Sequence, residues 1–217
     1  MILFHAPGAS SQAAHILLRE AGLPFALERV DLSTHQWSGG GDYRKLNPKA
    51  YVPALKLDDG NLLTECAVIL EFIADQAPAK NLIPPAGTRE RYRVLEWLAF
   101  IATELHKNFI TPERHGGVAA NFLSKTEEGQ AQTRLHVSPR LAYVDRQLEG
   151  RDYLGGSIFT APDAYLFTML TWAGRLSLDL SSWPNLSAFF NRIRSRPAVE
   201  AVLRVEGPPH ALLEANK

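Results

Sequence analysis

The sequence has little of what would suit an exported, nucleic-acid-binding or membrane-bound protein. Cys66 is its only cysteine, and 23 Lys and Arg residues balance 23 Asp and Glu residues. One cysteine excludes an intrachain disulfide, which fits a reducing cytosol. Zero net charge gives no attraction to nucleic acid or to an anionic membrane. No apolar run approaches the roughly 18 residues of a membrane span, and the start resembles no secretory signal. We therefore expect a cytoplasmic protein that binds neither nucleic acid nor a membrane.

Short catalytic and metal-binding motifs are also absent. The sequence contains no H-E-x-x-H, C-x-x-C, G-x-S-x-G, G-x-G-x-x-G or phosphate-loop pattern. Its histidines do not fall at metal-ligand spacings, so we predict no metal. What remains is a chain of 217 residues, 46% hydrophobic and 21% charged, which is ordinary for one large globular domain or two small ones.

Residues 1–80 alternate strand and helix patterns. The predicted elements are a strand at 2–4, a helix from Ser10 or Ser11 to 20, a strand at 25–32, a short helix at 42–46, strands at 52–57 and 61–63, and a helix from Thr64 or Glu65 to 74. Gly22 is placed to end the first helix. This order favours a mixed sheet with helices on its faces.

Residues 81–88 and the segment after them differ from this pattern. Two adjacent prolines and a glycine in 81–88 predict a linker between a domain at 1–80 and a domain at 89–217. From Arg89 onward only helical periodicity remains. The predicted helices cover 89–113, 126–148, a stretch after Phe159, 186–194 and 198–205, with Pro139 expected to kink or interrupt the second.

Three segments of the first domain could bind a ligand. Pro53 lies where a proline fits a sheet, at a strand start or edge. A cis Val52-Pro53 bond would leave the Val52 N–H and C=O free to pair with an extended peptide. The alternative is an ordinary trans bond. The helix start at Thr64, Glu65 and Cys66 could hold an anion, or Thr64 could simply cap it. A hydroxyl just after Pro7-Gly8 could donate to a bound thiolate, or serve as a cap.

Two segments of the second domain carry candidate groups. Glu104 and His106 are two residues apart on a predicted helix, so they point to different faces. Such charges are also common on a plain surface helix. Thr160 to Asp163 has the pattern of a helix N-terminus in which Asp163 reaches back to the capping residue. We therefore interpret Asp163 as structural and not catalytic.

Four blocks in order resemble the bacterial beta-class glutathione transferases. They read F-x-x-P-G-A-x-S, L-x-N-P-K-x-x-V-P-A-L-x-L-D-D-G-x-L-L-T-E, Y-x-x-L-E-W-L-x-F-I-A-T-E-L-H-K and F-T-x-x-D-A-Y-L-F, and the likeness covers about residues 1–207. The resemblance implies an α/β thioredoxin-like N-terminal domain, an all-helical C-terminal domain, a homodimer, and glutathione as co-substrate.

The resemblance also implies roles for individual residues. It implies a cis Val52-Pro53 bond, with Val52 pairing to the cysteinyl unit of glutathione. Glu65 and the Cys66 backbone would bind the γ-glutamyl end, and His35 would lie near the glycyl carboxylate. His106 and Lys107 would lie beside the thiol, and Thr103 and Glu104 would reach the neighbouring subunit's glutathione. Ser10, Ser11 or His106 would stabilise the thiolate. We take Ser10 and His106 as the catalytic candidates, and Ser11 as a glutathione-binding one.

Four positions depart from the family pattern. Ser10 replaces the usual cysteine, His5 a tyrosine, His35 a lysine and Ala99 an asparagine. The leading hypothesis is an enzyme that joins glutathione to small hydrophobic electrophiles of unspecified identity. A glutathione-dependent thiol or peroxide reductase is one alternative, although loss of the position-10 cysteine argues against a mixed-disulfide route. A non-catalytic protein that binds glutathione or apolar ligands is the other.

Overall fold

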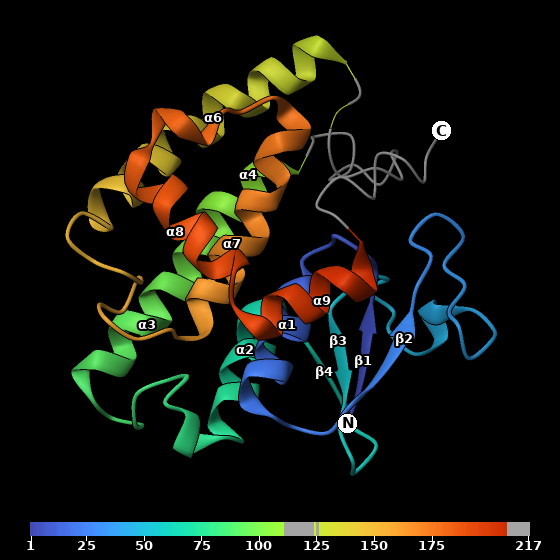
Figure 1. The fold of residues 1–217 in the computed structure, drawn as a ribbon. Helices are drawn as coiled ribbons and strands as arrows, with labels where there is room; N and C mark the ends of the chain where they lie inside the picture. The colour runs from blue at the N-terminus through green and yellow to red at the C-terminus, as the bar shows by residue number, and fades with distance from the viewer. Residues whose placement is uncertain (111–123, 125, 208–217) are drawn as a thin grey trace.

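A four-stranded mixed sheet forms the first half of the chain (Figure 1). The computed structural model describes residues 1–110, 124 and 126–207. Strands β1 (Ile2–His5), β2 (Ala26–Arg29), β3 (Ala54–Lys56) and β4 (Leu62–Thr64) are ordered β2-β1-β3-β4. β1 pairs with β2 in parallel and with β3 antiparallel, and β3 pairs antiparallel with β4. The mixed sheet is as predicted, although β2 and β3 are shorter than the predicted 25–32 and 52–57.

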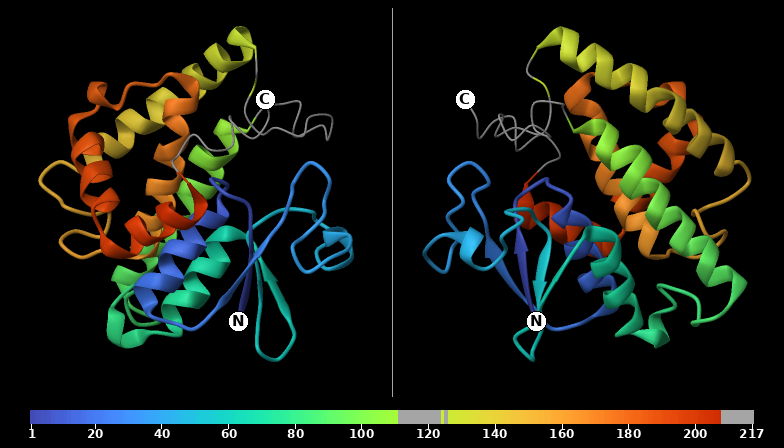
Figure 2. Two further views of the ribbon diagram at one scale, coloured as in Figure 1. Left: turned by 45° about the vertical axis from the view of Figure 1, so that its right-hand side comes forward. Right: turned by 180° about the vertical axis from the view of Figure 1, so that it is seen from behind.

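The two faces of the sheet pack against different partners. Helices α1 (Ser11–Ala21) and α2 (Cys66–Asp75) lie together on the face that meets the helical half (Figure 2). Leu3 and Leu55 belong to the core on that side, whereas Phe4 and Ala54 belong to a smaller core with Tyr43 on the other side. This alternation follows from the two-residue period of a strand. Tyr43 lies in the 3₁₀ turn η1 (Tyr43–Lys45), where a short helix was predicted.

The second half of the described chain is all-helical. Its elements are α3 (Arg89–Phe100), the π-helical segment η3 (Ile101–His106), α4 (Lys107–Phe109), α6 (Glu127–Gln147), α7 (Ala161–Ala173), α8 (Pro184–Arg194) and α9 (Pro197–Glu206), with 3₁₀ turns η2 (Pro78–Lys80), η4 (Gly174–Leu176) and η5 (Leu180–Ser182). Every residue of α7 is buried, and α7 packs against both α1 and α2. None of the helices in the described residues is long and apolar enough to cross a membrane.

Two of the long helices differ from the prediction. The helix predicted at 89–113 changes to π geometry at Ile101 and its described part ends at Phe109, while 111–113 lie outside the described residues. A π turn adds a residue to each hydrogen-bonded ring, so the 3.6-residue period of the sequence pattern does not reveal it. Pro139 lies inside α6, and the helix continues past it without interruption.

The predicted helix starts are only partly right. Asp163 is buried and accepts hydrogen bonds from the Thr160 N–H at 2.7 Å and the Leu154 N–H at 2.9 Å, so its structural role is confirmed.

Neither Ser10 nor Thr64 caps a helix through its side chain. Ser10 is the N-cap residue of α1 but makes no capping bond, and Thr64 lies in β4, one residue before the N-cap Glu65.

A buried polar cluster joins the two halves at the turn after β1. The Gly8 N–H donates to Glu206 Oε2 at 3.3 Å, and the Gly8 carbonyl accepts from Trp172 Nε1 at 2.9 Å. Glu206 Oε1 lies 2.7 Å from His15 Nδ1 and 3.6 Å from His5 Nδ1. Burial raises the pKa of Glu206, but its interactions with both histidines outweigh it and leave that pKa below its ordinary value. His5 therefore faces this interior cluster.

Candidate functional site

A cavity of about 490 Å³ lies where the two halves meet, and it brings together most of the predicted site residues. From the first half it is lined by Ser10, Val52, Pro53, Glu65 and Cys66, and from the second by Thr103, His106 and Lys107. These residues are spread over nearly a hundred positions of the sequence. Among the described residues, no group of three or more His, Cys, Asp or Glu side chains could hold a metal ion.

One end of the cavity is polar and is built from two loops and a helix start. The Val52-Pro53 peptide bond is cis, as the resemblance implied. Glu65 precedes α2 with φ of 70°, a left-handed backbone value that is uncommon for a residue with a side chain. Lys49 Nζ donates to Glu65 Oε1 at 2.6 Å and to Thr64 Oγ1 at 3.0 Å. Cation, carboxylate and free N–H groups of the α2 start thus lie side by side, as binding of a zwitterionic ligand requires.

The hydroxyl and thiol at the inner end are already hydrogen-bonded. Ser10 Oγ donates to the Val52 carbonyl oxygen at 3.1 Å, and Cys66 Sγ donates to the Ser10 carbonyl oxygen at 3.6 Å. Burial raises the pKa of the Cys66 thiol well above its usual range, opposed in part by the neighbouring Tyr165 hydroxyl. A thiol held protonated is a poor nucleophile, so Cys66 is suited to a structural role.

His106 occupies the same end, against α7. Its Nδ1 lies 2.6 Å from the Tyr165 hydroxyl, and its ring meets the Trp172 ring edge-on at 5.2 Å. Burial lowers the pKa of His106 to about 4, with the Glu65 charge opposing the shift. The imidazole is therefore neutral near pH 7. The apolar residues of the cavity lining include Ala9, Leu32, Ala102, Ile110 and Trp172.

Three predicted residues do not line this cavity. Ser11 is fully buried and exchanges hydrogen bonds with the backbone of Ala6, at 3.2 and 3.3 Å. His35 lies in the loop after β2 with φ of 58°. Glu104 pairs with Arg140 of α6 at 2.8 Å. Glu104 and His106 thus have different surroundings, as their two-residue spacing predicted. The roles of Ser11, His35 and Glu104 toward glutathione stay predictions, and that of Glu104 concerns the neighbouring subunit's glutathione, not this cavity.

Other lining residues were missed at the sequence level. Lys49, Tyr51 and Trp172 line the cavity, as does Tyr165. Lys49 and Tyr165 both stand inside the motif blocks quoted above, so their positions were in view without a role. What singles them out is a contact with Glu65 or His106, which spacing along the chain does not reveal.

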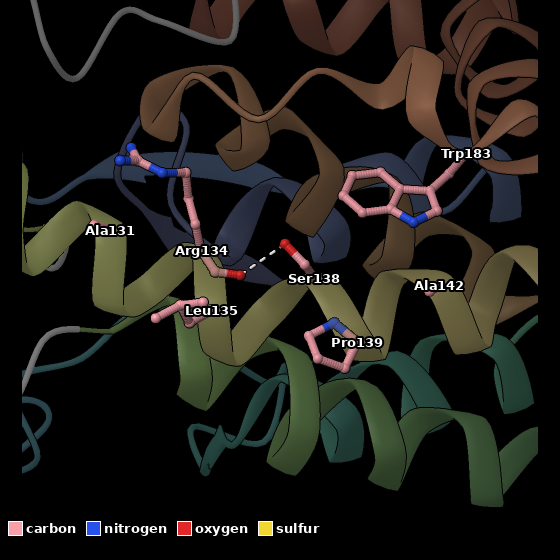
Figure 3. A pocket seen from close by; sticks show the side chains of 7 residues that line it. All are labelled: Ala131, Arg134, Leu135, Ser138, Pro139, Ala142 and Trp183. Carbon is pink, nitrogen blue, oxygen red and sulfur yellow. Dashed lines mark hydrogen bonds between the residues drawn. The ribbon is translucent and has the colours of Figure 1, made fainter.

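A second pocket, of about 640 Å³, lies on α6 and is lined by none of the predicted residues (Figure 3). Ala131, Leu135, Pro139, Ala142 and Trp183 supply most of its wall. Its charged group, Arg134, is held by an ion pair with Glu127 and donates to the Leu176 carbonyl at 3.0 Å. The cavity between the two halves is the functional candidate because it gathers the polar and titratable groups.

Two protein-family models match the chain and identify its class. The glutathione S-transferase N-terminal domain matches residues 9–76, and the glutathione S-transferase C-terminal domain matches residues 97–197. The fold is therefore a thioredoxin-like domain with a four-stranded sheet followed by a helical domain, as the sequence resemblance implied.

Individual relatives cover nearly the whole chain. Glutathione S-transferase GstA of Escherichia coli O157:H7 is 43% identical over 95% of this chain and 99% of its own. The solved structure of a sphingomonad glutathione S-transferase complexed with glutathione is 41% identical, with a TM-score of 0.86 over 95% of this chain and 99% of that one. A bacterial beta-class enzyme of Sphingomonas chungbukensis gives the same identity, TM-score and coverage. The chain belongs to the glutathione S-transferase family.

Proposed function

We propose that this glutathione transferase joins the glutathione thiolate to small hydrophobic electrophiles. The observation that carries the proposal is one cavity whose lining combines the charged groups at the start of α2 with apolar side chains and with His106 and Ser10. The charged end suits a peptide with a free amino group and carboxylates. The apolar wall suits a second substrate that is small and hydrophobic, whose identity the lining does not specify.

In the proposed complex, glutathione lies extended along the charged end. Val52 offers its N–H to the cysteinyl unit, as an added strand pairs with an edge. Glu65 accepts from the γ-glutamyl ammonium while the Cys66 N–H holds the adjacent carboxylate, since carboxylates bind well at a helix start. Lys49, Thr103 and Lys107 also border the cavity and add donors around the rest of the peptide.

The decisive experiment pairs glutathione affinity with turnover. Binding by calorimetry together with conjugation of a chromogenic aryl halide supports the proposal. Binding without turnover of any electrophile would favour a non-catalytic binding protein, and reduction of mixed disulfides or peroxides without conjugation would favour a reductase. The raised pKa of Cys66 and the serine at position 10 both argue against a reductase.

Ser10→Ala should slow conjugation about tenfold, because a hydrogen bond to a charged group is worth about 1.5 kcal/mol or more. In the proposed complex the Ser10 hydroxyl turns from the Val52 carbonyl to the glutathione sulfur. The bound thiol should then lose acidity in the variant, visible as a higher pH for thiolate absorbance in the ultraviolet. An unchanged rate and thiol pKa would remove Ser10 as a thiolate donor.

Ser10→Cys tests the position independently. A cysteine there should exchange with oxidised glutathione, forming a mixed disulfide and releasing one reduced glutathione. Mass spectrometry should detect the adduct, and dithiothreitol should reverse it. The parent chain, in which Cys66 is buried, is the control and should form none. If Ser10→Cys forms no adduct, position 10 does not face the sulfur.

We further propose a cytoplasmic detoxifying homodimer, with the domain boundary within residues 81–88. Partly exposed aromatic side chains at Trp97, Phe100 and Tyr143 form a cluster between α3 and α6 that suits a subunit interface. Sedimentation at micromolar concentration should give a mass twice the 24.1 kDa of one chain. The Tyr143→Arg variant should sediment with the mass of a single chain. Ile158→Arg, at a loop residue that is 52% exposed, is the control and should leave the dimer intact. A monomeric wild-type chain would exclude the homodimer.

A further inference from the structure

His106 is held in place by a residue of the central helix α7. The 2.6 Å contact between His106 Nδ1 and the Tyr165 hydroxyl joins positions 59 residues apart. Tyr165 is 1% exposed, in a helix whose every residue is buried. Its ring also meets the His106 ring edge-on at 5.8 Å, and the Trp172 ring meets the same imidazole at 5.2 Å. Since both partners are fixed by the core, the orientation of the imidazole is set before any substrate binds.

The contact limits where the ring proton can lie. A neutral imidazole carries one N–H, on either Nδ1 or Nε2. Among the described residues, Tyr165 is the hydrogen-bonding partner of the ring, through Nδ1. Burial and the neighbouring Cys66 raise the pKa of Tyr165 well above 10, so the phenol keeps its proton. The direction of one hydrogen bond therefore decides whether Nε2 is a donor or an acceptor.

Chemistry favours donation by the phenol. A phenol O–H, with an ordinary pKa near 10, is a stronger acid than a neutral imidazole N–H, and an imidazole nitrogen is a better acceptor than a phenol oxygen. The other polar neighbour of the Tyr165 hydroxyl, Cys66 Sγ, is a weak acceptor. The phenol proton is best placed on the line to Nδ1.

Two other side-chain donors at the inner end, Ser10 and Cys66, are already hydrogen-bonded. The Ser10 proton is directed at the Val52 carbonyl, and the Cys66 proton at the Ser10 carbonyl. The charged side chains that line the cavity are Lys49, which pairs with Glu65, and Lys107. A donor on His106 Nε2 would therefore supply a hydrogen bond to sulfur without first breaking another.

We propose that Tyr165 is a positioning residue that donates its hydroxyl proton to His106 Nδ1 and so holds the ring as the Nε2–H tautomer, a hydrogen-bond donor toward the glutathione sulfur. The donation to sulfur rests on the proposed function. The tautomer itself does not, because it is a property of the folded chain.

The direct test is the tautomer of His106 in the wild-type protein. Two-bond ¹H–¹⁵N spectra of protein labelled with ¹⁵N-histidine distinguish the two tautomers, and loss of one ring signal in His106→Asn assigns it among the seven histidines. At pH 7 we expect Nε2–H in the wild type and a mixture in Tyr165→Phe. A wild-type Nδ1–H tautomer, or an imidazolium, would overturn the proposal. This measurement needs neither glutathione nor a stable variant.

The kinetic test uses Tyr165→Phe, which removes the hydroxyl and keeps the ring. The kcat for conjugation should fall about three- to tenfold with little change in the KM for glutathione, as expected when a neutral hydrogen bond that acts through another residue is lost. The pKa of the bound thiol should rise by about half a unit or more. Tyr153→Phe, which removes a hydroxyl bonded to Arg196 at 3.2 Å outside the cavity, is the matched control and should change neither.

The outcomes separate this proposal from the proposed function. A Tyr165→Phe variant with the wild-type thiol pKa would overturn the positioning role, even if its melting temperature fell. If the wild-type chain bound no glutathione or conjugated no electrophile, the proposed function and the donation to sulfur would be wrong. The ¹⁵N spectra would still decide the hydrogen bond between Tyr165 and His106.

Discussion

Glu65→Gln should weaken glutathione binding about 10- to 100-fold, because a hydrogen bond between charged groups is worth about 1.5–3 kcal/mol. The substitution keeps the size of the side chain and removes the negative charge that the γ-glutamyl ammonium would meet. Glu65 lines the cavity, and its side chain is 65% exposed. The fold should therefore be unaffected. Isothermal titration calorimetry with reduced glutathione measures the dissociation constant.

Glu96→Gln is the matched control for this experiment. Glu96 also forms an exposed ion pair, with Arg93 at 2.7 Å, but it does not line the cavity. Exposed pairs of this kind add little stability, so both variants should melt close to the wild type. Equal glutathione affinity in Glu65→Gln and Glu96→Gln would mean that Glu65 merely precedes α2 and binds no ligand.

Asp163→Ala should lower the free energy of unfolding by about 2–4 kcal/mol, since it leaves two buried N–H groups, of Leu154 and Thr160, without an acceptor. Burial raises the pKa of this carboxyl to about 6, although both backbone groups and the Thr160 hydroxyl oppose the shift. For a chain of this size the melting temperature should fall by about 5–15 °C. Calorimetric scanning and denaturant titration measure the two quantities.

Asp179→Ala offers a control of the same chemistry at the surface. Asp179 accepts from the Ser181 N–H at 2.9 Å and from its hydroxyl at 2.6 Å, in an exposed turn. Water can replace those bonds, so the melting temperature should change by a few degrees at most. Comparable losses in the two variants would show that burial at Asp163 adds nothing to its capping role.

The local order of the fold could be predicted because it depends on local patterns. Leu3 and Phe4 alternate between two cores as a strand requires, and Gly22 adopts the left-handed φ of 69° that ends α1. The π geometry of Ile101–His106 could not be predicted, because it changes the helical register without a marker in the sequence. It lies where the helix borders the cavity.

Side-chain hydrogen bonds of small polar residues were the least predictable feature. Ser10 and Thr64 had the sequence context of helix caps. Instead Ser10 donates to Val52, 42 residues away, and Thr64 accepts from Lys49. A hydroxyl next to a helix start takes whichever partner the packed chain brings closest, and such partners come from other elements.

The sequence alone predicted the two-domain fold, the cis proline and eight of the residues that line the cavity, because these follow from local pattern and from motif blocks that stay in order. Tertiary structure decided which of the predicted residues meet. It turned Glu104 toward Arg140, placed Ser11 in the interior, and brought Tyr165 onto His106. These outcomes depend on contacts between elements far apart in the chain, and spacing along the chain fixes a side chain's face but not its partner.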